Sequence, residues 1–191
     1  MGISVEEYRN LISKSSRGKA NPNPKRQILG KSNRELGKLF EEEVQIICDV
    51  YESENLARIE KTPEPMKILK HVDEGRFEAV FEKSAQPDFK GTIKGGRSVV
   101  FDAKYTESDR INYAVLKKHQ RDILNKYQEL GAMAFILVGF GNGKIYKIDI
   151  DDWSNMKAKF GRQFILQSEL DEHNYGAMKN DNRIADFLRL L

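Results

Sequence analysis

Length and composition describe one folded domain and exclude several classes of protein. The chain has 191 residues, of which 39% are hydrophobic and 32% charged, and its 10 Phe, 7 Tyr and one Trp can fill a core. No apolar stretch is long enough for a membrane span or a signal peptide. The single cysteine, Cys48, excludes an internal disulfide, and Cys and His residues lack zinc spacing. We therefore expect a cytoplasmic protein that does not engage membranes.

The first 33 residues are predicted to form a flexible basic arm. Between residues 14 and 34 there are seven Lys or Arg and no acid, and the prolines and glycines of this segment are expected to break regular structure. The net charge of +3 permits nucleic-acid binding without requiring it. The arm is either a solvated leader or a phosphate-binding segment, whose candidate contacts are Lys14, Arg17, Lys19, Lys25 and Arg26.

Residues 34–160 carry the pattern of an α/β domain. Apolar residues at three- and four-residue spacing predict an amphipathic helix over residues 35–51, and a second helix over 112–130 ends at Gly131. Short apolar runs predict strands over 56–61, 66–72, 77–83, 98–105, 132–140 and 144–150. Asp151 and Asp152 are predicted to cap a short helix over 153–160. This order predicts a mixed central sheet with helices on its faces.

The remaining residues, 161–191, have weaker patterning. We predict a C-terminal extension that packs on the core and contains a last helix over residues 183–190.

Three charged residues suit metal-dependent hydrolysis of a phosphodiester. Asp102 and Lys104 are two residues apart on a predicted strand, so both project from one face while Ala103 points away. Asp88 lies on the neighbouring strand, across a glycine-rich turn, and can face Asp102 at about 5 Å between Cβ atoms. Two carboxylates can hold Mg²⁺, with Mn²⁺ as an alternative ion. Lys104 would orient the attacking water and stabilise the pentacovalent phosphorane.

The competing interpretation is that Asp-x-Lys is an ordinary solvated strand face, because such tripeptides are common. Two features favour function. The charges interrupt a strand otherwise built for burial by Val99, Val100 and Phe101, and Pro87-Asp88 lies upstream at the spacing that a hairpin requires.

These residues resemble the signature of the PD-(D/E)xK nuclease superfamily, and the wider pattern resembles the RecU-type Holliday junction resolvases of Gram-positive bacteria and their phages. The resemblance covers about residues 33 to 149. It implies a restriction-endonuclease-like fold with a mixed central sheet flanked by helices. The matching blocks are residues 33–34, 37–43, 59–65 with Ile68, 87–91, 100–104, 116–120 and 131–140.

The resemblance also implies an activity and a set of roles. It implies a homodimer that binds four-way DNA junctions and cuts two opposed strands with Mg²⁺. Asp88 and Asp102 would be metal ligands, Lys104 the transition-state stabiliser, and Gln120 a further metal-site residue on the second helix. Asp102 stands where this family usually has glutamate. The glycine-rich stretch 91–97 would take the place of a protruding stalk that these resolvases insert into a junction.

Two further sets of candidates depend on position. Glu41 fits a G-x-x-x-E signature on the first helix of related resolvases, whereas the helical period favours Glu43 as the carboxylate that faces the sheet. We slightly favour Glu41, and either residue could be solvated. The candidates for contacts with the DNA backbone in the core are Lys61, Lys90, Lys94, Arg97, Lys117 and Lys118.

Two other functions stay open on the sequence. The first keeps the chemistry but changes the substrate, as in a restriction, replication or repair nuclease. The second is a junction-binding protein that has lost activity, which the presence of Asp88, Asp102 and Lys104 disfavours.

Overall fold

The computed structural model describes residues 24–63, 66–73, 75–81, 86–173, 175–177 and 186–188. The chain divides into two units, Met1–Ser32 and Asn33–Leu191. In the first unit, the candidate contacts Lys14, Arg17 and Lys19 lie outside the described residues, and Lys25 and Arg26 lie in the first turn of helix α2 (Pro24–Ser53).

Helix α2 begins well before the predicted start at Glu35, so the expectation that the basic segment lacks regular structure is wrong from Pro24 onward. Two physical facts explain the difference. Proline is tolerated at the first position of a helix, where its missing N–H would have no partner anyway. A single interior glycine such as Gly30 weakens a helix by only about 1 kcal/mol.

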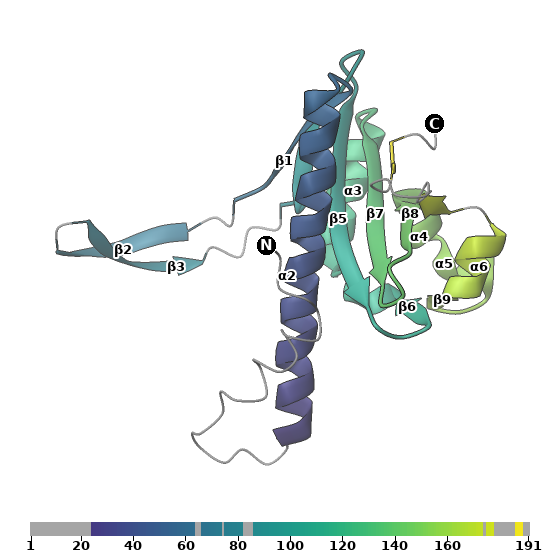
Figure 1. The fold of residues 1–191 in the computed structure, drawn as a ribbon, viewed down its shortest axis with the longest axis horizontal. Helices are drawn as coiled ribbons and strands as arrows, with labels where there is room; N and C mark the ends of the chain where they lie inside the picture. Colours follow the sequence, from purple (N-terminus) through teal and green to yellow (C-terminus); the bar gives the residue numbers. More distant parts are fainter. Residues whose placement is uncertain are drawn as a thin grey trace. The chain divides into compact units, whose positions relative to one another are not determined.

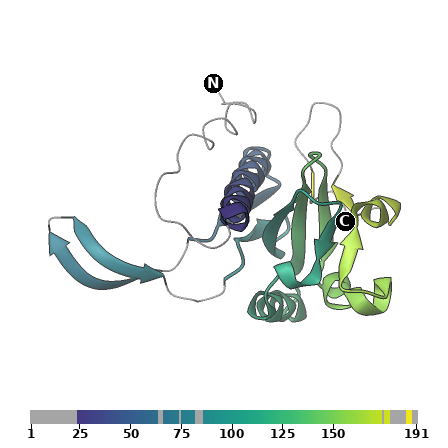
Figure 2. The same cartoon turned by 90° about the horizontal axis from the view of Figure 1, so that it is seen from below.

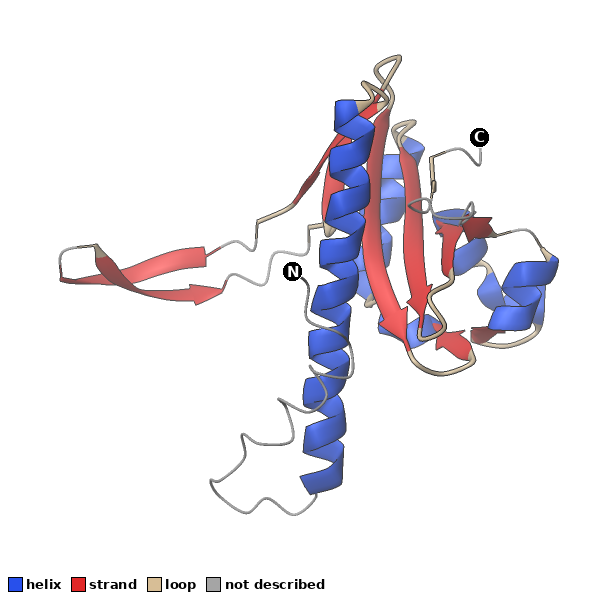
Figure 3. Ribbon diagram, in the orientation of Figure 1, coloured by secondary structure: helices blue, strands red, loops and turns tan. Residues whose placement is uncertain are grey.

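The second unit is built on a six-stranded sheet with the strand order β1-β4-β5-β7-β8-β10 (Figures 1 and 3). β5 and β7 are parallel and the other neighbours are antiparallel, so the sheet is mixed as predicted. The predicted α/β class is therefore confirmed. The strands are β1 (Ala57–Lys61), β4 (Phe89–Ile93), β5 (Ser98–Thr106), β7 (Met133–Phe140), β8 (Ile145–Asp149) and β10 (Gly176–Ala177).

Helices cover both faces of this sheet (Figure 2). One face packs on α2 through buried residues such as Phe40, Val44 and Ile47. Gly139 of β7 permits close approach, because a Cβ there would lie 2.5 Å from the Phe40 ring. The opposite face packs on α3 (Lys118–Glu129), α4 (Ile150–Ser154) and α5 (Met156–Phe160). Among the described helices, none has the length and apolar content needed to cross a membrane.

Two small two-stranded sheets flank the central one. β2 (Met66–Asp73) pairs with β3 (Arg76–Phe81); the sequence predicts both strands, but as part of the central sheet rather than as a sheet of their own. β6 (Arg110–Asn112) pairs with β9 (Phe164–Leu166), and this pairing was not predicted because each strand has only three residues. A 3-10 turn, η1 (Tyr113–Val115), separates β6 from α3, so the second helix starts later than predicted.

Two smaller helix predictions also need correction. The helix expected over residues 153–160 is two short helices that meet at Asn155, and Asp149 rather than Asp151 or Asp152 occupies the N-cap of the first. The last helix expected over residues 183–190 is not present at residues 186–188, which form a bridge and a bend. Helix α6 (Gln167–Glu172) lies earlier in the C-terminal segment.

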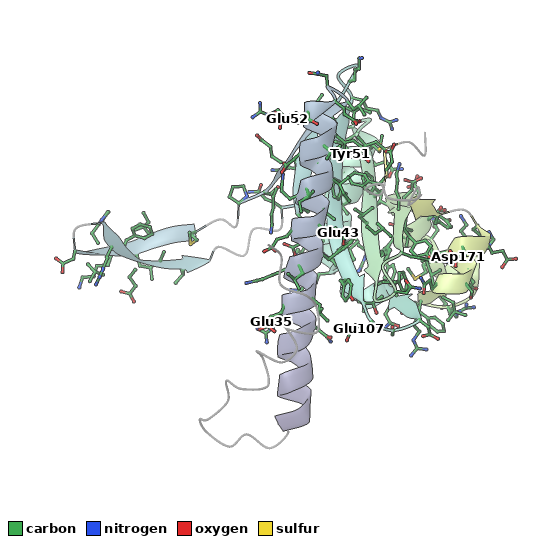
Figure 4. The ribbon with its side chains drawn as sticks, in the orientation of Figure 1. Glu35, Glu43, Tyr51, Glu52, Glu107 and Asp171 are labelled. Atoms are coloured by element: carbon green, nitrogen blue, oxygen red, sulfur yellow. The ribbon has the colours of Figure 1, made fainter. Side chains whose placement is uncertain are left out.

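Near the end of the C-terminal segment, one side chain enters the hydrophobic core. Phe187 is fully buried and meets the rings of Tyr51 and Phe101 edge-on, at 5.2 and 5.3 Å between centroids. The hydroxyl of Tyr51 donates to Asp186 Oδ1 at 2.8 Å. Tyr51 lies on α2 (Figure 4). These contacts therefore join residues 186 and 187 to the first described helix.

Candidate active site

The strand register places Asp88 and Asp102 side by side. Phe89 pairs with Phe101 in the antiparallel ladder between β4 and β5, so the residues that flank this pair face each other. The backbone N–H of Asp88 donates to Asp102 Oδ1 at 2.9 Å, and the N–H of Ala103 donates to Asp88 Oδ2 at 3.0 Å. Each carboxylate is thus fixed by the backbone of the other strand.

Lys104 completes this cluster on the same face of β5. Its Nζ lies 3.2 Å from Asp88 Oδ2 and 3.5 Å from Asp102 Oδ2. Ala103 packs in the apolar cluster on the opposite, α2-covered face. The sequence-based expectation that Asp102 and Lys104 share a face while Ala103 turns away therefore agrees with the structure.

Burial dominates the electrostatics of the site. Asp102 is fully buried on an inner strand, between β4 and β7. Burial raises the pKa of Asp102, Lys104 opposes that shift, and the nearby charge of Asp88 adds to it. For Lys104, burial lowers the pKa but the two carboxylates outweigh it, so the net shift is upward. The lysine is therefore held as an ammonium beside two carboxylates.

The geometry of the two aspartates fits a divalent cation. Oδ2 of Asp102 is buried and, within the described residues, has no hydrogen-bond donor. The Lys104 ammonium lies 3.5 Å from this oxygen, and a buried carboxylate oxygen without a hydrogen bond is further stabilised by a cation that approaches more closely. Among the described residues, His, Cys, Asp and Glu nowhere gather in groups of three. A cation at this position would therefore take two carboxylate ligands, from Asp88 and Asp102, and would complete its shell with backbone carbonyls or waters.

The two candidate acids on helix α2, Glu41 and Glu43, differ in their exposure to solvent. Glu41 is half-buried and forms an ion pair with Lys61 at 2.8 Å, at the end of β1. Glu43 is exposed on α2 (Figure 4), so the prediction from helical period that it faces the sheet is wrong. The stripe that contacts the sheet contains Phe40, Val44 and Ile47, and Leu39 is 41% exposed. The prediction was wrong because it counted Leu39 as part of the apolar stripe, which moved the predicted centre of the stripe toward Glu43.

Gln120 has a local partner in the structure. Its Oε1 accepts a hydrogen bond of 3.1 Å from the backbone N–H of Lys117, at the first turn of α3. This contact satisfies one of the N–H groups that a helix start leaves unpaired. α3 covers the face of the sheet from which Asp102 and Lys104 project, so Gln120 lies on the same side as the aspartate–lysine cluster.

The candidate DNA-binding residues of the core differ in whether their side chains already bind another residue of the protein. Lys118 pairs with Asp122 at 2.8 Å, Lys90 donates to Gln86 at 2.7 Å, and Arg97 donates to the carbonyl of Gly131. Lys94 and Lys117 have exposed side chains. These contacts leave Lys94 and Lys117 as the most available cations of the predicted set.

Thr62 is a site residue that sequence reasoning missed. Its backbone N–H donates to the carbonyl of Asp88 at 2.8 Å, which extends the pairing of β1 and β4 to the candidate metal ligand Asp88. Its Oγ1 is buried without a hydrogen-bond partner in the described part of the chain. In the sequence, Thr62 follows directly on a predicted strand and lies in the matching block 59–65, but neither observation singles it out from its neighbours.

Comparisons with known proteins define the class. The sequence model of RecU, recombination protein U, matches residues 35–191. The Holliday junction resolvase RecU of Bacillus cytotoxicus is 30% identical over 149 residues, which are 72% of this chain and 73% of that protein. RecU of Pediococcus pentosaceus is 28% identical over 80% of this chain and 81% of that protein. The chain belongs to the RecU family.

Solved structures are also similar. One of them is the Holliday junction resolvase Hjc of Archaeoglobus fulgidus, with a TM-score of 0.43 and 11% identity, covering 73% of this chain and 88% of that chain.

Proposed function

We propose that this protein is a Mg²⁺-dependent endonuclease that resolves four-way DNA junctions by cutting two opposed strands. The observation that carries the proposal is the cluster of Asp88, Asp102 and Lys104, in which two carboxylates and an ammonium meet within 3.5 Å. The relatives of the RecU family are named Holliday junction resolvases, which supports the choice of substrate.

Each side chain of the cluster has a distinct task in hydrolysis. Asp88 and Asp102 would hold the divalent ion, which supplies Lewis-acid stabilisation of the charge that develops on the phosphate. Lys104 is placed to orient the attacking water and to stabilise the negative charge of the transition state. Thr62 fixes the backbone of Asp88 through its 2.8 Å hydrogen bond, so it acts as a positioning residue.

Cleavage of synthetic DNA tests the proposal. The protein should cut a four-way junction with Mg²⁺ faster than a linear duplex that contains the same arm sequences. Mn²⁺ should replace Mg²⁺, and EDTA should stop the reaction. Equal rates on the junction and the duplex would contradict the resolvase assignment while leaving the nuclease chemistry in place.

The hairpin β2–β3 is proposed as the element that enters the junction. The expectation that residues 91–97 form the stalk disagrees with the structure, because residues up to Ile93 belong to β4 and only a tight turn through Gly95 and Gly96 follows. Every residue of β2 is exposed, and large apolar side chains are exposed on both strands. Apolar surface of this kind indicates a binding partner. These side chains are Met66, Ile68, Leu69, Val72, Phe77 and Val80.

Replacing apolar hairpin residues by serine tests this element. The Phe77→Ser, Val80→Ser variant should lose its preference for junctions over duplexes and keep the duplex binding that depends on charge. A matched control is Leu130→Ser, since Leu130 is 75% exposed at the end of α3. An unchanged preference in the hairpin variant would remove the hairpin from the proposal.

The remaining assignments follow from the same function. A symmetric junction has two strands to cut, so we propose a homodimer that supplies one site for each strand. We propose that residues 1–33 act as a basic arm along the DNA backbone, residues 34–160 as the nuclease core, and 161–191 as an extension packed on that core. Work on chromosomal or phage DNA would place the protein in the cytoplasm.

A further inference from the structure

Two arginines on the α3 side of the sheet are stacked on aromatic rings. Cζ of Arg110 lies 4.9 Å from the ring centroid of Phe164, and Cζ of Arg121 lies 4.3 Å from that of Tyr113. In the part of the chain that the structure describes, neither guanidinium lies within ion-pair distance of a carboxylate. Arg162 differs, because it also stacks on Phe164 but binds Glu169 at 2.6 Å.

The two rings belong to one fixed element, the ribbon of β6, η1 and β9. Asn112 pairs with Phe164, and the backbone N–H of the next residue, Tyr113, donates to the carbonyl of Gln163 at 2.9 Å. Ile111 and Ile165, which pair between the same strands, are buried in the core. The ribbon is thus anchored by its inward side chains, and it presents Arg110 to solvent.

This ribbon follows directly on the strand that carries the active site. Thr106, at the end of β5, is two residues beyond Lys104, which is about 7 Å along a strand. Oγ1 of Thr106 donates to the carbonyl of Arg110 at 3.3 Å. Arg121 follows Gln120 in the first turn of α3, and its Nη1 donates to the carbonyl of Leu116. Asp102, Lys104 and the ribbon's anchoring side chains all lie on the α3 side of the sheet.

We propose that the surface formed by Arg110, Arg121, Phe164 and Tyr113 binds the sugar-phosphate backbone of the DNA arm next to the scissile phosphate. The proposal rests on the proposed nuclease function and adds a substrate-binding surface to it. A guanidinium stacked by its face keeps N–H groups at its edge for phosphate oxygens, and the stacking orders the long side chain before DNA binds. An arginine without an internal carboxylate keeps its full charge for the phosphates.

The test measures how DNA binding depends on salt. Dissociation constants for a linear duplex and for a four-way junction would be measured in EDTA for the full chain, Arg110→Gln, Arg121→Gln and the double variant. Each substitution should lower the slope of log K against log salt by about 0.9 and weaken binding roughly three- to tenfold, equally on both DNAs. The matched control is Arg58→Gln, an exposed arginine already paired with Glu52 and Glu60, which should leave the slope unchanged.

A further variant separates charge from stacking. Phe164→Leu keeps both arginines and should weaken binding with little change of slope, because the stack that orders Arg110 is lost while Arg162, which also stacks on this ring, stays bound to Glu169. The contrary result is that both arginine variants keep the salt slope of the unmodified protein and show only a lower melting temperature. That result would assign the stacks a structural role and overturn the inference. If Arg121→Gln does not fold, the exposed Arg110 alone decides. Unchanged slopes in a protein that still cuts junctions would leave the nuclease function standing, whereas a protein that neither binds nor cuts DNA would remove both.

Discussion

The two faces of β5 come from alternating residues of one strand, and they are chemically opposite. On the α2 side, Phe101 stacks between Phe89 and Phe135 at 4.9 and 4.7 Å between ring centroids, and Ala103 packs beside them. On the α3 side, Asp102 and Lys104 form the charged cluster.

The difference shows how a buried charge can be kept in an inner strand. The apolar face supplies the packing free energy that holds β5 in place, and pairing with β4 and β7 on both sides fixes the register. The charged face is then free to be optimised for chemistry instead of stability. Substitutions on one face should therefore change catalysis, and substitutions on the other should change the free energy of unfolding.

The largest effect is expected from the charged face. Asp102→Asn should reduce Mg²⁺-dependent cleavage of a junction by roughly 1000-fold or more, because a ligand of the ion is lost. Junction binding in EDTA should persist. The melting temperature should change little, because the carboxamide can still accept from the N–H of Asp88 and Lys104 keeps Asp88 as its ion-pair partner. Single-turnover cleavage and thermal unfolding measure both. Cleavage within tenfold of the unmodified protein would show that the site is elsewhere.

On the apolar face, Phe187→Ala should lower the free energy of unfolding by about 3 to 5 kcal/mol, since a fully buried ring is removed. Urea denaturation measures this change. Leu130→Ala is the control, because its exposed side chain should contribute almost nothing. A loss for Phe187→Ala below about 1 kcal/mol would mean that the C-terminal segment is not part of the core.

Lys104→Ala tests the charged face a second time. Cleavage should fall roughly 100- to 1000-fold, the cost of removing one preorganised group that stabilises the transition state. The two aspartates would also lose their counter-ion, so Mg²⁺ should raise the melting temperature of the variant more than that of the unmodified protein. Equal stabilisation by Mg²⁺ in both proteins would contradict the idea that ammonium and metal face the same carboxylates.

At Cys48 on the α2 side an effect is expected only at alkaline pH, so near neutral pH it is the smallest of the four. Burial, followed by the neighbouring charge of Asp49, raises the pKa of Cys48 to about 12. The folded thiol stays protonated while the unfolded thiol ionises near pH 8.5, so stability falls as the pH rises from about 8.5 toward 12, by at most about 1.4 kcal/mol per unit. Cys48→Ala should flatten this part of a stability profile, and alkylation of the native thiol at pH 8 should be slow. Rapid alkylation of folded protein would contradict the burial.

The fold was predictable where the local pattern is long. The strands around Phe101, the apolar run that became β7 and the helix before Gly131 are set by residue periodicity, which reports the environment of each residue directly. The short strands β6 and β9 were missed, because three residues carry no period and their pairing joins segments far apart in the chain. The α2 start was misplaced because proline and glycine were given too much weight as helix breakers.

The sequence by itself determined which charged residues meet at the candidate site, since the cluster of Asp88, Asp102 and Lys104 follows from strand alternation and a hairpin spacing, both of which are local. Only the tertiary structure decided which first-helix acid turns inward, where the hairpin β2–β3 exposes its apolar residues, and that Phe187 enters the core. The tertiary structure also decided that Arg110 and Arg121 stack on aromatic rings of the ribbon. These features depend on contacts between segments distant in the chain, which local periodicity does not encode.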